Sequence, residues 1–147
     1  MKIAFGNDHA GFSMRDVLLS ELKNRGHEVL DLGAQCEDSV DYPDFAKAVC
    51  EAVTSGKADF GVLCCGTGVG ISIAANKIRG IRCSLVTDEF GAEMSRRHNN
   101  ANVLALRGRE FDAELNRKLM GIWLENGFDG GERHERRVRK ISEMESC

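Results

Sequence analysis

The sequence predicts a single α/β domain, in which a five-stranded parallel sheet is covered by helices on both faces and followed by an extra C-terminal helix. Three observations lead to this prediction. Short apolar runs alternate with amphipathic stretches along the whole chain, as in repeated strand–helix units. The 147 residues, 42% of them hydrophobic, suffice for one core. No repeat, low-complexity segment or linker divides residues 1–147.

The first half of the chain is expected to contain three strands and two helices. The strands are the apolar runs Lys2–Gly6, Glu28–Leu32 and Phe60–Cys65. Between the first two, Leu18 and Leu22 belong to a helical stripe that closes at Gly26. Between the second and third, Pro43 begins a helix, because proline suits a first helical turn, and Gly56 ends it.

The second half continues the alternation, and a glycine turn after Cys65 is expected to open a third helix. The remaining elements are a strand at Cys83–Thr87, a helix at Glu89–Arg97, a strand at Val103–Leu106, an amphipathic helix around Leu115–Trp123 and a charged helix from about Glu132 to Glu143. Right-handed crossovers place the carboxyl ends of all strands along one edge of the sheet, where open α/β folds bind ligands.

Polar loop residues follow four of these strands. In chain order they are Asp8 with His9, Cys65 with its glycines, Asp88, and Arg109. We expect these loops to share one edge of the sheet. His98 also lies in a polar, loop-like segment, and we expect it near one sheet edge together with His9. Two histidines so placed favour a catalytic role over two solvated side chains.

Composition and charge exclude several classes of protein. The net charge of −3 provides no general attraction to nucleic acid or anionic membranes. The N-terminal segment turns polar too early for a signal peptide, and no apolar run could span a bilayer, so a cytoplasmic location is expected. The six cysteines are then expected to be reduced. Their spacing does not suit zinc, and we expect no metal and no cofactor.

The run from Val62 to Lys77 is the most informative segment of the chain. An apolar strand ends in a thiol, passes through alternate glycines and continues into small, helix-compatible residues. Such a turn directs backbone N–H groups at an anion, and its positive field favours a thiolate. Cys64 and Cys65 are neighbours on a strand and therefore point to opposite faces. Cys65 flanks the turn and is the better candidate for a base or nucleophile.

Three phosphate- or nucleotide-binding motifs fit this turn poorly. A Walker loop requires a glycine, and a cysteine phosphatase an arginine, at the position of Ile71. A dinucleotide fingerprint requires G-x-G-x-x-G, whereas this run is G-x-G-x-G. The glycine spacing weakens the dinucleotide interpretation but does not exclude it, because Asp88 lies 22 residues after Gly66 at a strand end. A tight turn without any ligand is the remaining structural alternative.

The charged C-terminal helix offers a second candidate site. Arg133 and Arg137 are four residues apart and share one helix face, so that their guanidinium groups could hold a phosphate. A solvated helix is the usual explanation of such a segment. A nucleic-acid-binding surface is poorly supported, because the chain is acidic and only 6% of its residues are aromatic.

Several motifs occur in a characteristic order along the chain. They are Asn7-Asp8-His9, Asp41-Tyr42-Pro43, the run Cys65–Lys77, Ser95–Asn99, Asn102–Ala105, and Gly130-Gly131 leading to Arg133-His134 and Arg137-Val138. With these motifs the chain resembles the type B ribose-5-phosphate isomerases and the related galactose-6-phosphate isomerase subunits over essentially its full length. The resemblance implies a Rossmann-like αβα sandwich that interconverts ribose 5-phosphate and ribulose 5-phosphate, a step of the pentose phosphate pathway, without a metal.

The resemblance also implies a homodimer, which can pair into a tetramer, with active sites shared across the dimer interface. In this family Cys65 corresponds to the base that moves a proton between sugar carbons two and one, and His98 to the acid that opens the furanose ring. The substrate-binding residues that it implies are Asp8, His9, Tyr42, Gly66, Thr67, Gly68, Val69, Gly70, Asn99, Arg109, Arg133 and Arg137.

Among these implied residues, the backbone amides between Gly66 and Gly70 bind the enediolate oxygen, and Asp8 and Asn99 bind substrate oxygens. Tyr42 lines the site. The implied phosphate ligands are His9, Arg109, Arg133 and Arg137. Arg109 is expected to come from the partner subunit.

The chain follows one of two family branches and departs from the pattern at one point. In the other branch a glutamate at the position of Ile71 is the base, so the presence of Cys65 places this chain in the cysteine branch. An extra residue near Glu132 leaves the register of Arg133 open. A six-carbon substrate, allose or galactose 6-phosphate, and a non-catalytic sugar-phosphate-binding module also stay open. Cys65 and His98 together favour an enzyme.

Overall fold

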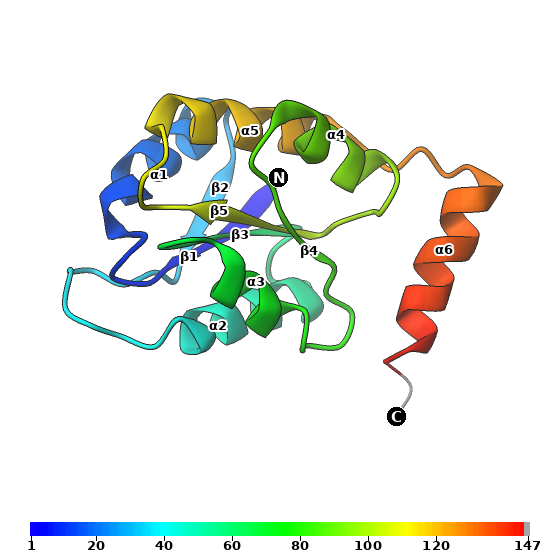
Figure 1. Ribbon diagram of the computed structural model, residues 1–147, viewed down its shortest axis with the longest axis horizontal. Coiled ribbons are helices and arrows are strands. Elements are labelled where there is room, and N and C mark those ends of the chain that lie inside the picture. The colour runs from blue at the N-terminus through cyan, green and yellow to red at the C-terminus, as the bar shows by residue number, and fades with distance from the viewer. Residues whose placement is uncertain (146–147) are drawn as a thin grey trace.

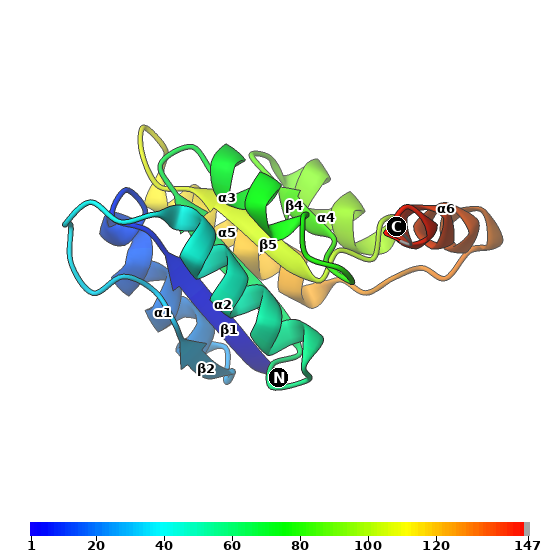
Figure 2. The same ribbon diagram turned by 90° about the horizontal axis from the view of Figure 1, so that it is seen from below.

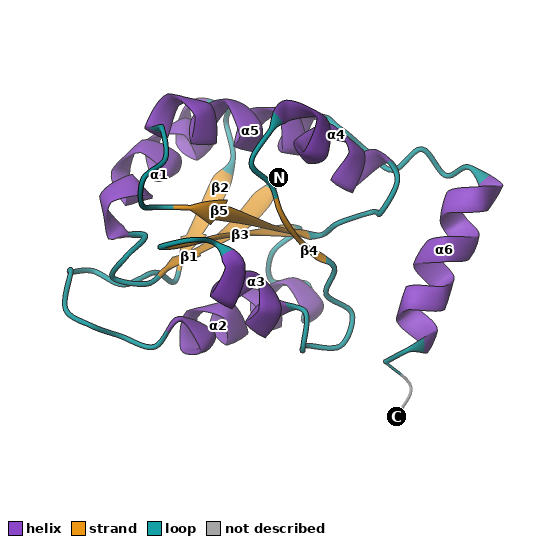
Figure 3. Ribbon diagram, viewed as in Figure 1, coloured by secondary structure: helices purple, strands orange, loops and turns teal. Residues whose placement is uncertain are grey.

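The computed structural model describes residues 1–145 and contains a five-stranded, all-parallel sheet in the order β2-β1-β3-β5-β4 (Figures 1 and 3). The strands are β1 (Lys2–Asn7), β2 (Glu28–Asp31), β3 (Phe60–Cys65), β4 (Cys83–Leu85) and β5 (Val103–Arg107). The predicted fold class is therefore confirmed. Each predicted strand is present, and its ends differ from the prediction by at most two residues.

Six α-helices connect and follow these strands within residues 1–145. They are α1 (Arg15–Asn24), α2 (Tyr42–Thr54), α3 (Val69–Ala75), α4 (Glu89–Arg97), α5 (Ala113–Glu125) and α6 (Glu132–Glu143). A short 3-10 helix at Phe12–Met14 precedes α1. Helices α1, α4 and α5 cover one face of the sheet, and α2 and α3 cover the other (Figures 1 and 2). The result is a three-layer αβα sandwich.

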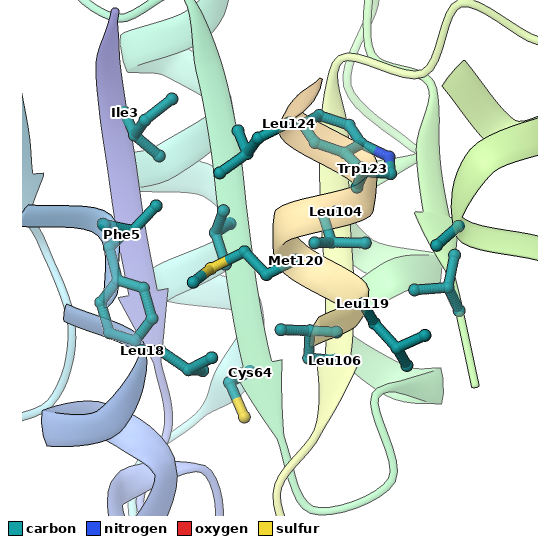
Figure 4. Packing of buried hydrophobic residues seen from close by; sticks show 14 of the residues in the cluster. Ile3, Phe5, Leu18, Cys64, Leu104, Leu106, Leu119, Met120, Trp123 and Leu124 are labelled. Atoms are coloured by element: carbon teal, nitrogen blue, oxygen red, sulfur yellow. The ribbon is translucent and has the colours of Figure 1, made fainter. Parts of the chain in front are cut away.

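Each face of the sheet has its own hydrophobic core. The core under α1, α4 and α5 is the larger, and Figure 4 shows Phe5, Leu104, Met120 and Trp123 packed together in it. The core under α2 and α3 contains smaller side chains, mostly alanine and valine. Because successive strand residues alternate between the faces, β3 contributes to both cores and is buried along nearly its whole length.

The strand order creates a crevice at the carboxyl edge of the sheet between β1 and β3. From β1 the chain moves outward to β2, and it then returns to place β3 on the other side of β1. Connections that leave in opposite directions open such a crevice, where ligands bind in open α/β folds. Hydrogen bonds tie the loops at this edge together, among them Asp8 N–H to the Cys64 carbonyl at 3.2 Å and Gly108 N–H to the Cys65 carbonyl at 2.8 Å.

Helix α6 stands away from the sandwich (Figures 1 and 2). None of its residues is buried, whereas each of the other five α-helices has at least three buried residues. One of its two apolar residues, Ile141, is 40% exposed. Among the described residues, no helix combines the length and the apolar character needed to cross a membrane.

Candidate active site

The glycine turn holds the Cys65 side chain at the carboxyl end of β3. The thiol is 4% exposed, and the Gly68 N–H donates to its Sγ at 3.2 Å. Gly68 has a φ of +76°, and a Cβ added there would lie 2.5 Å from Leu85 Cδ1 and 3.0 Å from the Leu106 carbonyl oxygen. Glycine is therefore required at this position for both its conformation and its size. The hydrogen bond from Gly68 also fixes the position of the sulfur beside the turn.

The other amides of the turn are divided between structural and free groups. The Val69 N–H donates to Thr67 Oγ1 at 3.2 Å, and Gly68 N–H is occupied by the Cys65 sulfur. Within residues 1–145 the N–H groups of Gly66, Thr67 and Gly70 have no acceptor. Three of the five amides expected to bind an oxyanion are thus free to do so, next to the thiol.

Cys64 and Cys65 differ as the alternation along a strand predicts. Cys64 packs in the core under α1, α4 and α5, and its side chain points into that core in Figure 4. Cys65 belongs to the core on the opposite face. Burial raises the pKa of the Cys64 thiol well above its ordinary value, so that this thiol stays protonated. The opposite orientation of the two side chains is confirmed.

The loop after β1 brings Asp8 and His9 to the same edge. Asp8 is 4% exposed, and its Oδ1 accepts the Gly11 N–H at 2.8 Å, which leaves its second oxygen available. The Val40 N–H donates to His9 Nδ1 at 3.2 Å. A neutral His9 must therefore carry its proton on Nε2, and this nitrogen can donate to a ligand.

Arg109 and Tyr42 border the glycine turn of their own chain. The Arg109 N–H donates to the Gly66 carbonyl at 3.0 Å, and the Arg109 side chain passes beside Gly66. The Tyr42 ring covers Gly70, where an added Cβ would come within 2.7 Å of it. The resemblance implied that Arg109 completes a partner's site. The backbone hydrogen bonds between the loops after β3 and β5 place Arg109 beside the glycine turn of its own chain, and its assignment to a partner's site stays a prediction.

His98 lies at the opposite edge of the sheet from Cys65, contrary to the expectation that it shares an edge with His9. Helix α4 begins next to the carboxyl edge, where Asp88 caps it by accepting the Gly91 N–H at 2.7 Å. The helix then runs antiparallel to the strands, so that His98, its C-terminal cap, reaches the amino edge just before β5. Asn99 follows there. The capping role of Asp88 also removes the support for a dinucleotide fingerprint.

Helix α6 extends this second region. The His98 and His134 rings are stacked, with centroids 4.2 Å apart and planes within 7° of parallel. Arg133 and Arg137 are exposed on the same helix, as their spacing predicts. A cleft of about 550 Å³ separates α6 from the sandwich and is lined in part by Asn99 and Ile141. This cleft is distant from the thiol and borders the His98 region.

Two features of the site escaped the sequence analysis. The stack of His134 on His98 joins residues 36 positions apart, and its trace in the sequence is the Arg133-His134 motif. The second is the buried Arg15, which pairs with Asp31 and donates to Asn7 Oδ1 at 3.2 Å next to Asp8. Within residues 1–145 no three His, Cys, Asp or Glu side chains converge as metal ligands would.

Comparison with known proteins agrees with this geometry. The profile of the Ribose/Galactose Isomerase family matches residues 3–141. Ribose-5-phosphate isomerase B of Escherichia coli is 45% identical over 144 residues, which cover 98% of this chain and 96% of that protein. Galactose-6-phosphate isomerase subunit LacB of Clostridium acetobutylicum is 38% identical over 98% of this chain and 83% of its own length.

A solved structure extends the similarity to three dimensions. The structure of Clostridium thermocellum ribose-5-phosphate isomerase B superposes with a TM-score of 0.97 at 49% identity, and the match covers 99% of this chain and 98% of that one. Sequence, fold and full-length coverage lead to the same assignment, and the chain belongs to the ribose/galactose isomerase family.

Proposed function

We propose that this protein interconverts D-ribose 5-phosphate and D-ribulose 5-phosphate, as a metal-independent isomerase in the cytoplasm and in the pentose phosphate pathway. The observation that carries the proposal is the Cys65 thiol, which lies beside three free amide N–H groups in the crevice between β1 and β3. A base next to preorganised oxyanion donors is what aldose–ketose isomerisation requires. Two similar proteins that carry the name of this activity support the choice of substrate.

The reaction begins with opening of the furanose ring. A proton is given to ring oxygen O4, the C1–O4 bond breaks, and the O1 hydroxyl loses its proton as the C1 aldehyde forms. We assign the donation to His98, because histidine has an ordinary pKa near 6.5 and can both give and accept a proton near neutral pH. Asn99 lies beside it to bind substrate oxygens.

Proton transfer between carbons follows. The Cys65 thiolate removes the C2 proton of the open aldose and delivers it to C1, while the O2 proton moves to O1. Negative charge develops on O1 in the intermediate enediolate, and the free N–H groups of Gly66, Thr67 and Gly70 stabilise it. Asp8 holds the sugar hydroxyls. The phosphate is remote from the reacting carbons, and its ligands position the sugar for the transfer.

The separation of His98 from Cys65 leads us to propose a homodimer with shared sites. One chain supplies Cys65, Asp8 and His9, and its partner supplies His98, Asn99, Arg133 and Arg137. Exposed apolar side chains lie on α3 and in the first turn of α4, among them Val69 at 47%, Ile73 at 56% and Phe90 at 73% exposure. Burying these side chains against a second copy would remove apolar surface from water.

An assay of purified protein in excess EDTA tests the activity. Ketose formation from ribose 5-phosphate is expected, and the Cys65→Ala variant should lack it. The similar LacB subunit makes a six-carbon sugar phosphate the second candidate substrate. If the wild-type protein turned over galactose or allose 6-phosphate and left ribose 5-phosphate unchanged, the assignment of the five-carbon substrate would be wrong. Turnover of neither sugar, with tight binding, would identify a non-catalytic module.

A mixing experiment tests the shared site separately. Cys65→Ala and His98→Asn subunits, each inactive alone, are unfolded together and refolded. In a mixed dimer one site receives both intact residues, so random pairing restores about one quarter of the wild-type activity if the sites are shared. If both residues acted within one chain, no site would be intact and the mixture would remain inactive.

A further inference from the structure

Two imidazole rings from distant parts of the chain face each other in the His98 region. His98 caps the C-terminus of α4, and His134 lies in the first turn of α6. Their ring centroids are 4.2 Å apart, and the planes are within 7° of parallel. Neither ring is fully exposed, although α6 buries none of its residues. The stack is thus a specific contact of an otherwise solvated helix.

The turn between α5 and α6 is built to maintain this contact. Arg97 Nε donates to both carboxylate oxygens of Asp129, at 3.0 and 3.2 Å, and Asp129 N–H donates to the Arg97 carbonyl at 3.0 Å. Gly130 then takes a φ of +64°, which reverses the chain into α6. The His134 N–H donates to the Gly131 carbonyl at 2.8 Å. These bonds fix the first turn of α6 against the last turn of α4.

The stack is also what orients the His98 ring. Within residues 1–145 neither ring nitrogen of His98 makes a hydrogen bond, although a hydrogen bond to the second nitrogen is the usual way to orient a catalytic imidazole. Packing of His134 against one face restricts the ring plane while leaving both nitrogens free. A residue that must donate a proton and take it back benefits from that freedom.

Charge favours the same arrangement. The pKa of His134 is lowered from its ordinary value, because its packing removes water from the ring and because His98, Arg133 and Arg137 lie nearby. Asp129 opposes this effect without reversing it. His134 is therefore neutral near pH 7, and its π face can lie against a protonated His98 without repulsion between two charges.

We propose that His134 is a positioning residue for ring opening, which holds the His98 imidazole through the stack and does not itself exchange protons with the sugar. The inference rests on the proposed role of His98. The proposed role of His134 concerns only one of the two steps of the reaction: the stack acts on ring opening and has no part in proton transfer at Cys65.

Two measurements on the same variants distinguish these parts. Ribulose 5-phosphate cannot form a furanose, since its O5 carries the phosphate, so that deuterium uptake from D₂O at its C1 reports proton transfer without any ring step. Isomerisation of ribose 5-phosphate includes both ring opening and proton transfer. His134→Ala should lower kcat for ribose 5-phosphate about three- to tenfold, the usual value of an aromatic pair. KM and the rate of deuterium uptake should not change.

His134→Phe is the conservative variant, because it retains a ring that can stack and lacks nitrogens. It should restore most of the kcat that His134→Ala loses. Alanine favours helix, and size-exclusion chromatography checks that both variants assemble like the wild type. Three outcomes would each overturn the proposal. The first is a wild-type kcat in His134→Ala, and the second is an equal fall of isomerisation and deuterium uptake in that variant. The third is a His134→Phe variant as slow as His134→Ala.

His98→Asn separates failure of this inference from failure of the proposed function. If His98→Asn loses ribose 5-phosphate isomerisation but keeps deuterium uptake, the ring-opening role stands, and the His134 variants alone decide the inference. If His98→Asn isomerises ribose 5-phosphate like the wild type, the proposed role of His98 is wrong and the inference falls with it.

Discussion

The two halves of the candidate site are held in place by different means. Around Cys65, backbone hydrogen bonds join the loops after β1, β3 and β5, and the candidate side chains Asp8 and Cys65 are each 4% exposed. Around His98, an exposed ion pair and a stack of two rings connect α4 to a helix with no buried residue. The first half is part of the core, and the second projects from it.

This difference indicates what each half requires. Residues at the carboxyl edge of a parallel sheet are positioned by the sheet itself, so the Cys65 half forms as soon as the domain folds. The His98 half depends on an exposed ion pair and one ring stack, so we expect it to open locally more readily than the Cys65 half. The predictions below compare the two halves with matched variants.

The largest expected effect is the loss of the base. Cys65→Ala should lower kcat by about 10³-fold or more, because no other group replaces a positioned base. Cys64→Ala removes the neighbouring thiol from the opposite face and should keep most of the activity, with a loss of about 1 kcal/mol in stability from the small cavity. Steady-state kinetics and urea unfolding measure both. Similar kcat losses in the two variants would contradict the assignment.

Glycine substitutions compare the backbone of the two halves. Gly68→Ala forces a side chain into a left-handed conformation and against Leu85 and the Leu106 carbonyl, so the free energy of unfolding should fall by about 3 kcal/mol. Gly131 has a φ of −70°, and a Cβ added there would lie 3.8 Å from the nearest side-chain atom of His134, so Gly131→Ala meets no strain. It should change stability by less than about 0.5 kcal/mol. Equal losses in urea unfolding would show that the halves are equally constrained.

Adjacent arginines of α6 test the proposed phosphate site. Arg137→Ala should raise KM for ribose 5-phosphate about ten- to hundredfold, the usual range for a lost hydrogen bond to a charged group. Arg136 points to another side of the helix, and Arg136→Ala should leave KM unchanged. If KM rose equally in both variants, general positive charge rather than a specific contact would explain the binding. An unchanged KM in Arg137→Ala would remove this residue from the site.

Two Arg–Asp pairs show how burial changes the contribution of an ion pair to the stability of the fold. The pKa of Asp31 is lowered from 3.8, because hydrogen bonds from Arg15 and Gly33 outweigh the opposing effect of burial. A carboxyl whose pKa is lowered by folding stabilises the folded protein at pH values above its unfolded pKa. This stabilisation is lost as the pH falls through the folded pKa. Asp31→Asn should therefore cost about 2 kcal/mol at pH 7, since it leaves the buried Arg15 without its partner.

The stability difference between Asp31→Asn and the wild type should disappear as the pH falls below 3.8 and through the lowered folded pKa of Asp31. The wild-type carboxyl is then protonated, and it is as neutral as the amide of the variant. Asp129→Asn is the control in the His98 half. The pKa of Asp129 is also lowered, by its hydrogen bond with Arg97, but this pair is exposed and screened by solvent. Urea midpoints for Asp129→Asn should match the wild type at both pH values.

Local sequence patterns predicted most of the fold. Apolar runs of four to six residues located every strand, and Pro43 and Gly56 marked the ends of α2 to within two residues. The strand at Cys83 is two residues shorter than expected: β4 ends at Leu85 and is an edge strand paired with β5. Its predicted last residues lead instead to the Asp88 cap of α4. Propensity alone does not distinguish an edge strand from a central one.

The sequence by itself determined the half-site around Cys65, because the thiol, the glycines and the oxyanion amides are contiguous and their geometry is that of a strand-to-helix turn. The tertiary structure decided where His98 lies, since α4 returns along the sheet and carries that residue to the far edge. It also decided that Arg109 lies beside Gly66 and that His134 stacks on His98. Spacing along a chain encodes contacts within one element or turn, whereas contacts between elements depend on helix direction and on the turns that connect them.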